Sequence, residues 1–224
     1  MPHPLRPSTP TTFSMNDLHD DPLRPPRLRV ALTGGPGGGK TTAADLLRRE
    51  LGERIVIVPE TATMLFAGGF PRSREPHARC SAQSAIYHVQ TNLEDIQTAL
   101  YPDRVLLCDR GTLDGAVYWP EDPNGFFEAV GTTVERELAR YDEVLFFETA
   151  AVGGMGIEGG NPTRIETLEE AVALDAALRS IWSKHPRFTL LPHEPSFLKK
   201  MTTAVAILGG IVARLDARIV GSHA

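Results

Sequence analysis

Residues Leu32–Leu47 read LTGGPGGGKTTAADLL, and this stretch decides the fold. Within it, Gly34–Thr41 match the pattern G-x-x-x-x-G-K-[ST], a glycine-rich loop that ends on a lysine and a hydroxyl residue. A short apolar run leads into the loop, and apolar residues at Ala43, Ala44 and Leu47 follow it with helical spacing. A strand before the loop and a helix after it are the context that gives this motif meaning, so the stretch predicts a phosphate-binding P-loop.

The residue types of this loop predict that it binds a nucleoside triphosphate together with Mg²⁺. Glycines let backbone N–H groups turn inward around a phosphate, and the helix N-terminus adds the positive end of its dipole. Lys40 can reach the β- and γ-phosphates, and the Thr41 hydroxyl can ligate Mg²⁺. We expect ATP as the nucleotide, with GTP left open. The expected cofactor-binding residues are Gly35, Pro36, Gly37, Gly38, Gly39, Lys40, Thr41 and Thr42.

The composition is that of an ordinary globular chain. The 224 residues are 42% hydrophobic and 23% charged, and the net charge of −5 argues against a general nucleic-acid binder. The longest apolar run, AVAILGGIVA, has ten residues, about half of what a transmembrane helix needs. Cys80 and Cys108 fit neither a disulfide framework nor a zinc site, so we expect a cytoplasmic protein with Cys108 in its core. The oligomeric state stays open.

Short apolar runs alternate with helical patterns, which is typical of a parallel sheet covered by helices on both faces. Strands are expected at 28–33, 55–59, 105–109, 144–148 and 188–192. Helices are expected at 40–51, 80–99, 125–140, 165–184 and 196–216. We therefore expect an α/β fold in three layers, with a P-loop domain over residues 28–216. Seven prolines and little apolar content predict a disordered tail at residues 1–27, and residues 217–224 are expected to form a C-terminal tail.

Asp109 and Arg110 bear on what happens to the phosphate. Asp109 ends the apolar run VLLCD, where a P-loop protein carries the aspartate that holds Mg²⁺. A hydrolytic ATPase usually has a second acid directly after that aspartate, whereas Arg110 follows it here. The guanine-reading pattern N/T-K-x-D of signalling GTPases is absent from the sequence. These features favour transfer of the phosphoryl group to a small acceptor over hydrolysis.

Such a transfer needs a carboxylate near the acceptor, arginines for the developing charge and a lid that excludes water. Glu60 follows the strand IVIVP and is the candidate that holds the acceptor or takes its proton. Arg110 could stabilise phosphate charge, and Arg164 lies in a glycine-rich segment that could close as a lid. The expected catalytic residues are Lys40, Glu60, Asp109, Arg110 and Arg164, and the expected metal ligands are Thr41 and Asp109.

Each of these candidates has a structural alternative. Glu60 could be an acid favoured by the dipole at a helix N-terminus. Asp109 and Arg110 could form a local ion pair. Arg164 could be an ordinary surface arginine.

The basic segment FAGGFPRSREPHARC precedes the second long helical pattern, on the expected acceptor side. Arg72, Arg74 and Arg79 make it suited to an anionic acceptor. The alternative is a solvated loop, because isolated surface charges are common.

The helical pattern that follows carries Gln83, Ile86, Gln90 and Glu94 on one face, with Tyr87 beside them. Amide and phenol groups on such a face could read a base or a sugar if it lines a pocket. The alternative is a polar face in contact with solvent. The expected substrate-binding residues are Glu60, Arg72, Arg79, Gln83, Tyr87 and Gln90.

The nucleotide base is expected near LLPHEPSFLKKM, residues 190–201, which follow the last strand. His185 and His193 lie close to this segment. Neither has a metal-ligand partner at useful spacing, so both are expected to be structural.

Six segments resemble an AAA-type ATP-binding domain family. They read VALTGGPGGGKTT, VPETATMLFAGG, QSAIYHVQTNLED, LLCDRGTLDGAVYW, YDEVLFFETAA and NPTRIETLEEAVALDAALRSIWSKHPRF, and the resemblance covers about residues 28–215. That family is similar to the nicotinamide-riboside kinase domain of NadR, and also to the N-terminal domain of an insect protein that moves a photoreceptor channel. The resemblance implies a kinase-like P-loop fold with a five-stranded parallel sheet in the order 2-3-1-4-5. The site residues that it carries over are Lys40, Thr41, Glu60, Asp109, Arg110 and Arg164.

The sequence therefore predicts a Mg²⁺-dependent, ATP-binding phosphotransferase that acts on a small metabolite resembling a nucleoside or nucleotide. No acceptor-reading motif of the NadR kind is present, so nicotinamide riboside is not implied. The alternative is a nucleotide-dependent binding module with slow NTPase activity. This module would recognise an anionic partner, such as a phosphoinositide headgroup, through the Arg72–Arg79 loop. The insect relative is tied to GTP and phosphoinositides, so the resemblance does not decide between the two functions.

Overall fold

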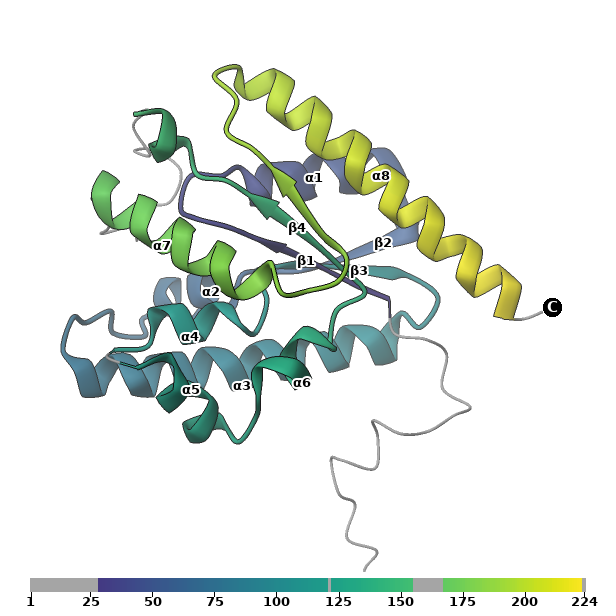
Figure 1. The fold of residues 1–224 in the computed structure, drawn as a ribbon. Coiled ribbons are helices and arrows are strands. Elements are labelled where there is room, and N and C mark those ends of the chain that lie inside the picture. Colours follow the sequence, from purple (N-terminus) through teal and green to yellow (C-terminus); the bar gives the residue numbers. More distant parts are fainter. Residues whose placement is uncertain (1–27, 121, 155–166, 223–224) are drawn as a thin grey trace, which may run out of the picture.

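Five parallel strands form the centre of the molecule, and helices cover both faces of the sheet (Figure 1). The computed structural model describes residues 28–120, 122–154 and 167–222. The strands are β1 (Arg29–Thr33), β2 (Ile55–Val58), β3 (Val105–Asp109), β4 (Glu143–Phe147) and β5 (Phe188–Leu191). Their order is β2-β3-β1-β4-β5 with every neighbouring pair parallel. The expected α/β fold and strand order are therefore confirmed.

The helices divide into two layers that bury separate apolar cores against the sheet. The longer helices are α1 (Lys40–Leu51), α3 (Pro76–Leu100), α5 (Pro123–Val130), α7 (Leu168–Trp182) and α8 (Phe197–Ser222). The shorter ones are η2 (Gly52–Arg54), α2 (Thr61–Ala67), α4 (Asp114–Tyr118), α6 (Val134–Leu138) and η3 (Ala150–Gly153). One core joins the sheet to α1 and α8, and the other joins it to α3–α7.

Strand β3 illustrates why the strands read as continuous apolar runs. Successive side chains of a strand point to opposite faces of the sheet, and here both faces are covered. Leu107 therefore belongs to the core under α1 and α8, while Leu106 and Cys108 belong to the opposite core. Cys108 is fully buried, as expected for a small core residue.

Several helix boundaries differ from the sequence-based expectation. The prediction of a single helix at 125–140 is wrong: α5 ends at Val130, the following Gly131 has a φ of 69°, and α6 is a separate short helix. The short helix α4 was not expected, whereas α2 begins directly after Glu60, where the structural alternative for Glu60 put a helix start. Helix α8 continues to Ser222 instead of ending near residue 216. The expected N-terminal tail and the expected lid, with Arg164, lie outside the described residues.

Among the described helices, none combines the length and the apolar character that crossing a membrane requires.

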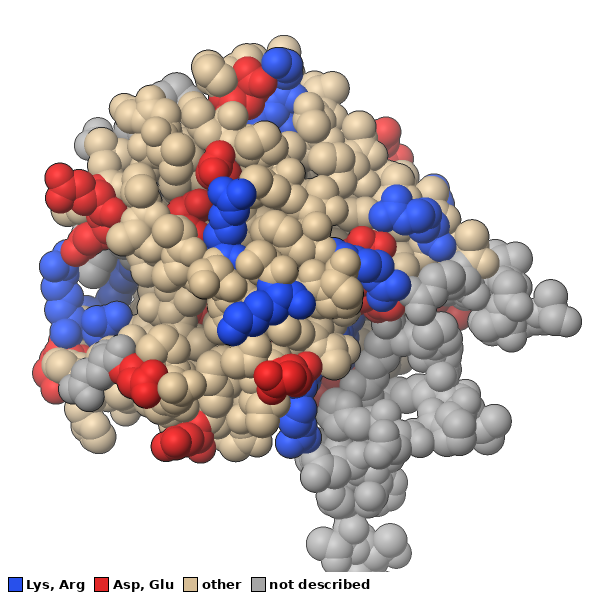
Figure 2. Space-filling view, viewed as in Figure 1, with Lys and Arg blue, Asp and Glu red and all other residues tan. Residues whose placement is uncertain are grey.

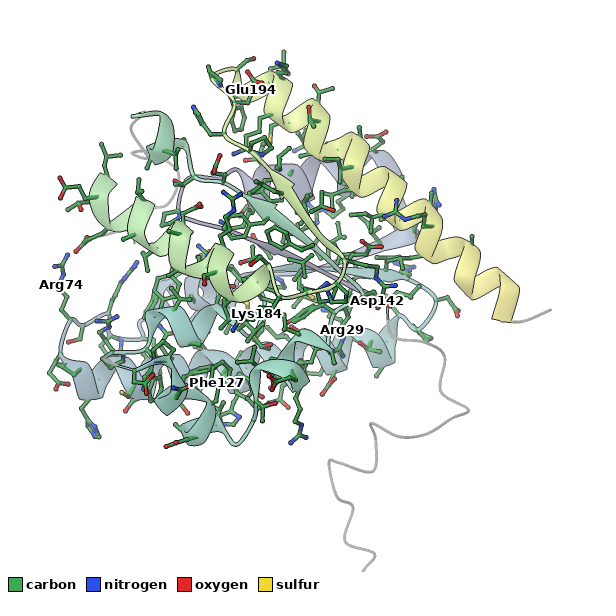
Figure 3. The ribbon with its side chains drawn as sticks, viewed as in Figure 1. Arg29, Arg74, Phe127, Asp142, Lys184 and Glu194 are labelled. Carbon is green, nitrogen blue, oxygen red and sulfur yellow. The ribbon has the colours of Figure 1, made fainter. Side chains whose placement is uncertain are left out.

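A buried carboxylate, Glu94 of α3, joins the first strand to the helical layer. Its Oε2 accepts hydrogen bonds from Arg29 Nη1 at 3.0 Å and Arg140 Nη2 at 2.7 Å. Its Oε1 accepts from the Tyr141 hydroxyl at 2.7 Å and Gln90 Nε2 at 3.1 Å. Figure 3 labels Arg29 at the start of β1, away from the P-loop at the other end of that strand. Although the sequence put Glu94 on the acceptor-facing stripe, it is a structural hub beneath that stripe.

We predict that Glu94→Ala lowers the free energy of unfolding by about 3–5 kcal/mol, because it leaves two buried guanidinium groups without their shared partner. Urea denaturation followed by circular dichroism measures this loss. Asp95→Ala is the matched control, since Asp95 bonds the same Arg29 but is 34% exposed, and it should cost about 1 kcal/mol. Equal losses for the two variants would contradict the role of Glu94 as the hub.

Candidate functional site

The P-loop runs from β1 to α1 at the carboxyl edge of the sheet. Gly34 has a φ of 127° and Gly39 a φ of 92°, which residues with a side chain rarely adopt. A Cβ at Gly34 would lie 2.1 Å from the Phe147 carbonyl oxygen, and a Cβ at Gly39 would lie 2.7 Å from the Met201 methyl group. The loop is therefore packed between the end of β4 and the first turns of α8, with no room for side chains at these glycines.

Thr41 and Asp109, the two expected metal ligands, lie in direct contact. The Thr41 hydroxyl donates to Asp109 Oδ2 at 2.6 Å. Burial raises the pKa of Asp109, and this hydrogen bond opposes the rise. The alternative of a local ion pair between Asp109 and Arg110 is not observed, because Arg110 contacts other carboxylates.

Lys40 folds back over the loop that it ends. Its ammonium group donates to the carbonyl oxygens of Gly34 and Gly35, each at 2.9 Å. Burial and, after it, the positive charge of Arg110 lower the pKa of Lys40 to about 7, against the opposing charges of Asp109, Glu60 and Asp114. Lys40 is thus held in the loop with a pKa close to neutral pH.

Arg110 connects the P-loop to the second half of the site. Its Nε donates to Glu60 Oε1 at 3.0 Å, and its Nη1 donates to both Asp114 Oδ2 and the Gly34 carbonyl oxygen at 3.0 Å. Among the described residues other than glycine, it alone has a positive φ, at 80°. Such a strained backbone is retained where surrounding contacts fix it, most often at functional sites.

Glu60 lies between the end of β2 and the start of α2, one strand removed from β1. Its Oε2 accepts a hydrogen bond from the Thr63 hydroxyl at 2.6 Å. Burial would raise the pKa of Glu60, but the Arg110 guanidinium and this hydrogen bond outweigh it and hold the pKa below its usual value. Glu60 is therefore an ionised carboxylate at neutral pH.

Asp114, in the first turn of α4, fixes Arg110 and was missed by the sequence analysis. Its Oδ1 accepts from the Thr33 hydroxyl at 2.8 Å and from Trp182 Nε1 at 2.7 Å, which leaves Oδ2 for Arg110. The signal that could have found it is its position four residues after Arg110 in DRGTLD, the spacing of a helical ion pair.

Asp175 of α7 also anchors the P-loop, and no sequence motif marks it. Its Oδ1 accepts from the backbone N–H groups of Gly35 at 2.8 Å and Thr149 at 2.9 Å. The Thr149 hydroxyl in turn donates to the Pro36 carbonyl oxygen. These bonds tie the loop to α7 and to the segment after β4.

A cavity of about 530 Å³ lies beside the Glu60–Arg110 pair, bounded by α2, α3, α4 and α7. All the residues expected to bind substrate line it: Glu60, Arg72, Arg79, Gln83, Tyr87 and Gln90. Arg110 and Pro36 also line it, whereas Lys40, Thr41 and Asp109 lie on the P-loop side. The polar face of α3 therefore lines a pocket instead of facing open solvent. The roles of its residues in binding stay predictions.

The oxygen ligands at the P-loop suit Mg²⁺ in particular. Mg²⁺ is usually held through one or two protein oxygens, phosphate oxygens and several waters, and Thr41 and Asp109 provide two such oxygens in contact. Within the described part of the chain, no three His, Cys, Asp or Glu residues cluster as a metal site of their own.

His185 has the structural role expected of it. It is buried, its Nε2 pairs with the Tyr141 carbonyl oxygen at 2.9 Å, and its Nδ1 accepts from the Arg187 N–H at 3.1 Å.

A parallel sheet in this strand order, with a P-loop after its central strand, defines the kinase-like class of P-loop folds. A family model described as an AAA domain matches residues 29–192, and the chain belongs to that family. Among solved structures, a deoxyadenosine kinase from M. mycoides with bound dATP matches with a TM-score of 0.55 and 14% identity. The match covers 81% of this chain and 99% of that one, and at this identity it bears on the fold alone. A search of curated proteins gives no match. The expected similarity to NadR stays a prediction.

We predict that Lys40 titrates near pH 7 in the nucleotide-free protein, because it is buried and lies near Arg110. Side-chain NMR of labelled lysine measures this directly. Arg110→Gln should raise the pKa of Lys40, since it removes a nearby positive charge. Arg104→Gln is the control, because Arg104 lies over the Tyr101 ring, outside the site, and should leave the titration unchanged. A Lys40 that titrates above pH 10 in the wild-type protein would contradict the prediction.

Proposed function

We propose that the protein is a Mg²⁺-dependent phosphotransferase that moves the γ-phosphoryl group of ATP to a hydroxyl of a small metabolite. The observation that carries this proposal is the position of the Glu60–Arg110 pair. Arg110 bonds the P-loop carbonyl of Gly34 with one nitrogen and Glu60 with another, so a carboxylate faces the cavity directly beside the phosphate-binding loop. The acceptor is nucleoside- or nucleotide-like, and GTP is the alternative donor.

The donor side consists of the P-loop amides, Lys40, Thr41 and Asp109. The loop amides and the start of α1 favour the phosphate chain, and Lys40 exchanges its carbonyl contacts for phosphate oxygens. That exchange favours the protonated lysine, because an anion then lies next to it. Bound Mg²⁺ would neutralise charge on the β- and γ-phosphates, with Thr41 and Asp109 as its protein-side ligands.

On the acceptor side, Glu60 holds the acceptor hydroxyl in line with the phosphoryl group. It accepts the hydroxyl proton as the new oxygen–phosphorus bond forms and the bond to ADP breaks. Its lowered pKa keeps it ionised and able to accept a hydrogen bond at neutral pH. Because phosphoryl transfer depends largely on positioning and electrostatics, this alignment is the main contribution of Glu60.

Arg110 supplies positive charge at the boundary between the two sides. Asp114, fixed by Thr33 and Trp182, holds the guanidinium in place, so little reorganisation is needed during the reaction. The AAA-domain family and the dATP-bound kinase of similar fold support a nucleotide as the donor.

A nucleotide-dependent binding module remains the competing proposal, because the same P-loop would serve it. The two differ in product. A phosphotransferase forms a phosphoester only when the acceptor is present, whereas a binding module with slow NTPase activity releases inorganic phosphate whether or not an acceptor is added.

We predict that Glu60→Gln lowers the rate of phosphoryl transfer by about 10²–10⁴-fold, the usual contribution of a positioned general base. Nucleotide affinity should stay within about twofold, because Glu60 lies on the cavity side of the site. The measurement is ³¹P NMR with Mg·ATP and a pool of nucleosides, nucleotides and sugars, followed by kinetics on the accepted compound. Glu53→Gln, at a side chain that is 93% exposed, is the matched control and should transfer at the wild-type rate.

Two results would count against these assignments. Transfer by Glu60→Gln at the wild-type rate would remove Glu60 from the mechanism. Release of inorganic phosphate alone by the wild-type protein, at a rate indifferent to the pool, would favour the binding module.

A further inference from the structure

Helix α3 runs along the cavity and presents a line of polar side chains to it. Arg79, Gln83, Tyr87 and Gln90 all line the cavity from this one helix. Gln90 lies at the inner end, where its carboxamide contacts Thr61 at 2.7 Å and the Arg110 carbonyl at 3.4 Å. Arg79 lies eleven residues earlier, which at the helical rise corresponds to about 16 Å toward the outer end. The line of side chains therefore extends from the reacting groups to the far end of the cavity.

The inner two members of this line are already engaged within the protein. Gln90 accepts from the Thr61 hydroxyl through Oε1, and its Nε2 donates to Glu94 at 3.1 Å. The Tyr87 hydroxyl donates to Glu137 Oε1 at 2.9 Å. Both residues shape the cavity wall, and binding a ligand through these atoms would break buried hydrogen bonds.

The outer two members keep donors that no described residue uses. Gln83 is half-buried and makes no hydrogen bond with any described residue. Arg79 is half-buried too, and its Nη2 donates to the Tyr118 carbonyl oxygen at 2.8 Å. A guanidinium has five N–H donors, so most of them remain.

The charges around the outer end favour an anion. Arg72 lies over the Phe66 ring at 5.2 Å and also lines the cavity. Arg74 crosses to α7 and pairs with Glu170 at 3.6 Å, so it offsets the acid that lines this end. Figure 3 shows Arg74 extending from the loop before α3 toward the start of α7, and Figure 2 shows basic side chains gathered beside acidic ones at that edge. The positive charge of Arg79 inside the cavity is therefore not cancelled by the lining acid.

We propose that the acceptor carries a carboxylate or phosphate at the end opposite its reacting hydroxyl, and that Arg79 and Gln83 bind this anionic group. A guanidinium binds the paired oxygens of either group through parallel N–H donors, and the Gln83 amide N–H adds a further donor. An uncharged acceptor of the same size would desolvate Arg79 without giving it a charged partner. The inference rests on the proposed function, because Glu60 defines the reacting end of the acceptor.

The test compares two pools of acceptors with Mg·ATP, using ³¹P NMR. The neutral pool contains uridine, ribose and glucose. The anionic pool contains their counterparts with an anion far from the primary hydroxyl, namely 5-carboxyuridine, ribose 1-phosphate and glucose 1-phosphate. Isothermal titration calorimetry measures the affinity of each compound for the protein, independently of phosphoryl transfer. We expect transfer to a member of the anionic pool, with at least tenfold lower efficiency on its neutral counterpart.

Variants then assign the preference to the two residues. Arg79→Gln should raise KM for the anionic acceptor at least tenfold while kcat and KM for ATP stay within about twofold, and Arg79→Lys should recover part of the loss. Gln83→Glu should also raise this KM, because it sets a like charge against the anion. Arg48→Gln is the control, since Arg48 is 61% exposed on α1 and pairs only with Asp45 among the described residues.

The outcomes separate the two proposals. Transfer confined to the neutral pool, or an unchanged KM in Arg79→Gln, would overturn the anionic end while leaving the phosphotransferase intact. Absence of transfer to both pools, with anionic compounds that bind wild type but not Arg79→Gln, would overturn the phosphotransferase and support the anion site. Equal binding of both pools to wild type and Arg79→Gln, without transfer, would overturn both.

Discussion

Two cations share a single carbonyl oxygen at the centre of the site. The Gly34 oxygen accepts from Lys40 Nζ at 2.9 Å and from Arg110 Nη1 at 3.0 Å. Burial and, after it, the positive charge of Arg110 disfavour a charged Lys40 and lower its pKa. Glu60 and Asp114 compensate on the Arg110 side, so the positive charge is fixed before any anion arrives. Preorganised charge of this kind stabilises developing negative charge without the reorganisation that water would need.

Helix α7 contacts the P-loop, the residue that fixes Arg110, and the cavity. Asp175 bonds the P-loop through Gly35, while Trp182, two turns later, bonds the Asp114 that fixes Arg110. The same helix lines the cavity with Ala173, Leu174 and Ala177. A displacement of α7 would therefore alter the phosphate loop, the arginine and the acceptor cavity together. A ligand that contacts α7 in the cavity has a physical route to the P-loop through the hydrogen bond between Asp175 and Gly35.

The sequence was sufficient for the fold because its signals are local. The P-loop fixes the order strand, loop, helix, and the three central strands, such as β3, are mainly apolar runs buried on both faces. The positions of Glu60, Asp109 and Arg110 were predictable for a related reason: they lie at or just after strand ends, at the edge where ligands of such sheets bind, while their roles stay predictions. The break between α5 and α6 was missed because Gly131 alone does not distinguish a helix end from a tolerated glycine. Asp114 and Asp175 were missed because their partners lie on other elements, distant in sequence.

The sequence does not distinguish Gln83 from Gln90, although their contacts in the cavity differ. They are the same residue type on the same helix face, and both line the cavity. Only the three-dimensional contacts separate them, since Gln90 is held by Thr61 and Glu94 while Gln83 has no partner among the described residues. Whether a polar side chain serves the protein or a ligand depends on that difference, and no pattern along the chain records it.

The cavity itself argues for an organic acceptor over water. A water molecule that attacks a phosphate needs a site of its own size, on the order of 30 Å³. The space beside Glu60 and Arg110 is about 530 Å³ and has apolar walls from α2, α3 and α7, such as Phe66, Ile86 and Leu174. Apolar walls of that extent gain stability only when a ligand displaces water from them. A P-loop with a fixed arginine, an ionised carboxylate and such a cavity therefore fits the proposed transfer to a molecule that fills the cavity better than transfer to water.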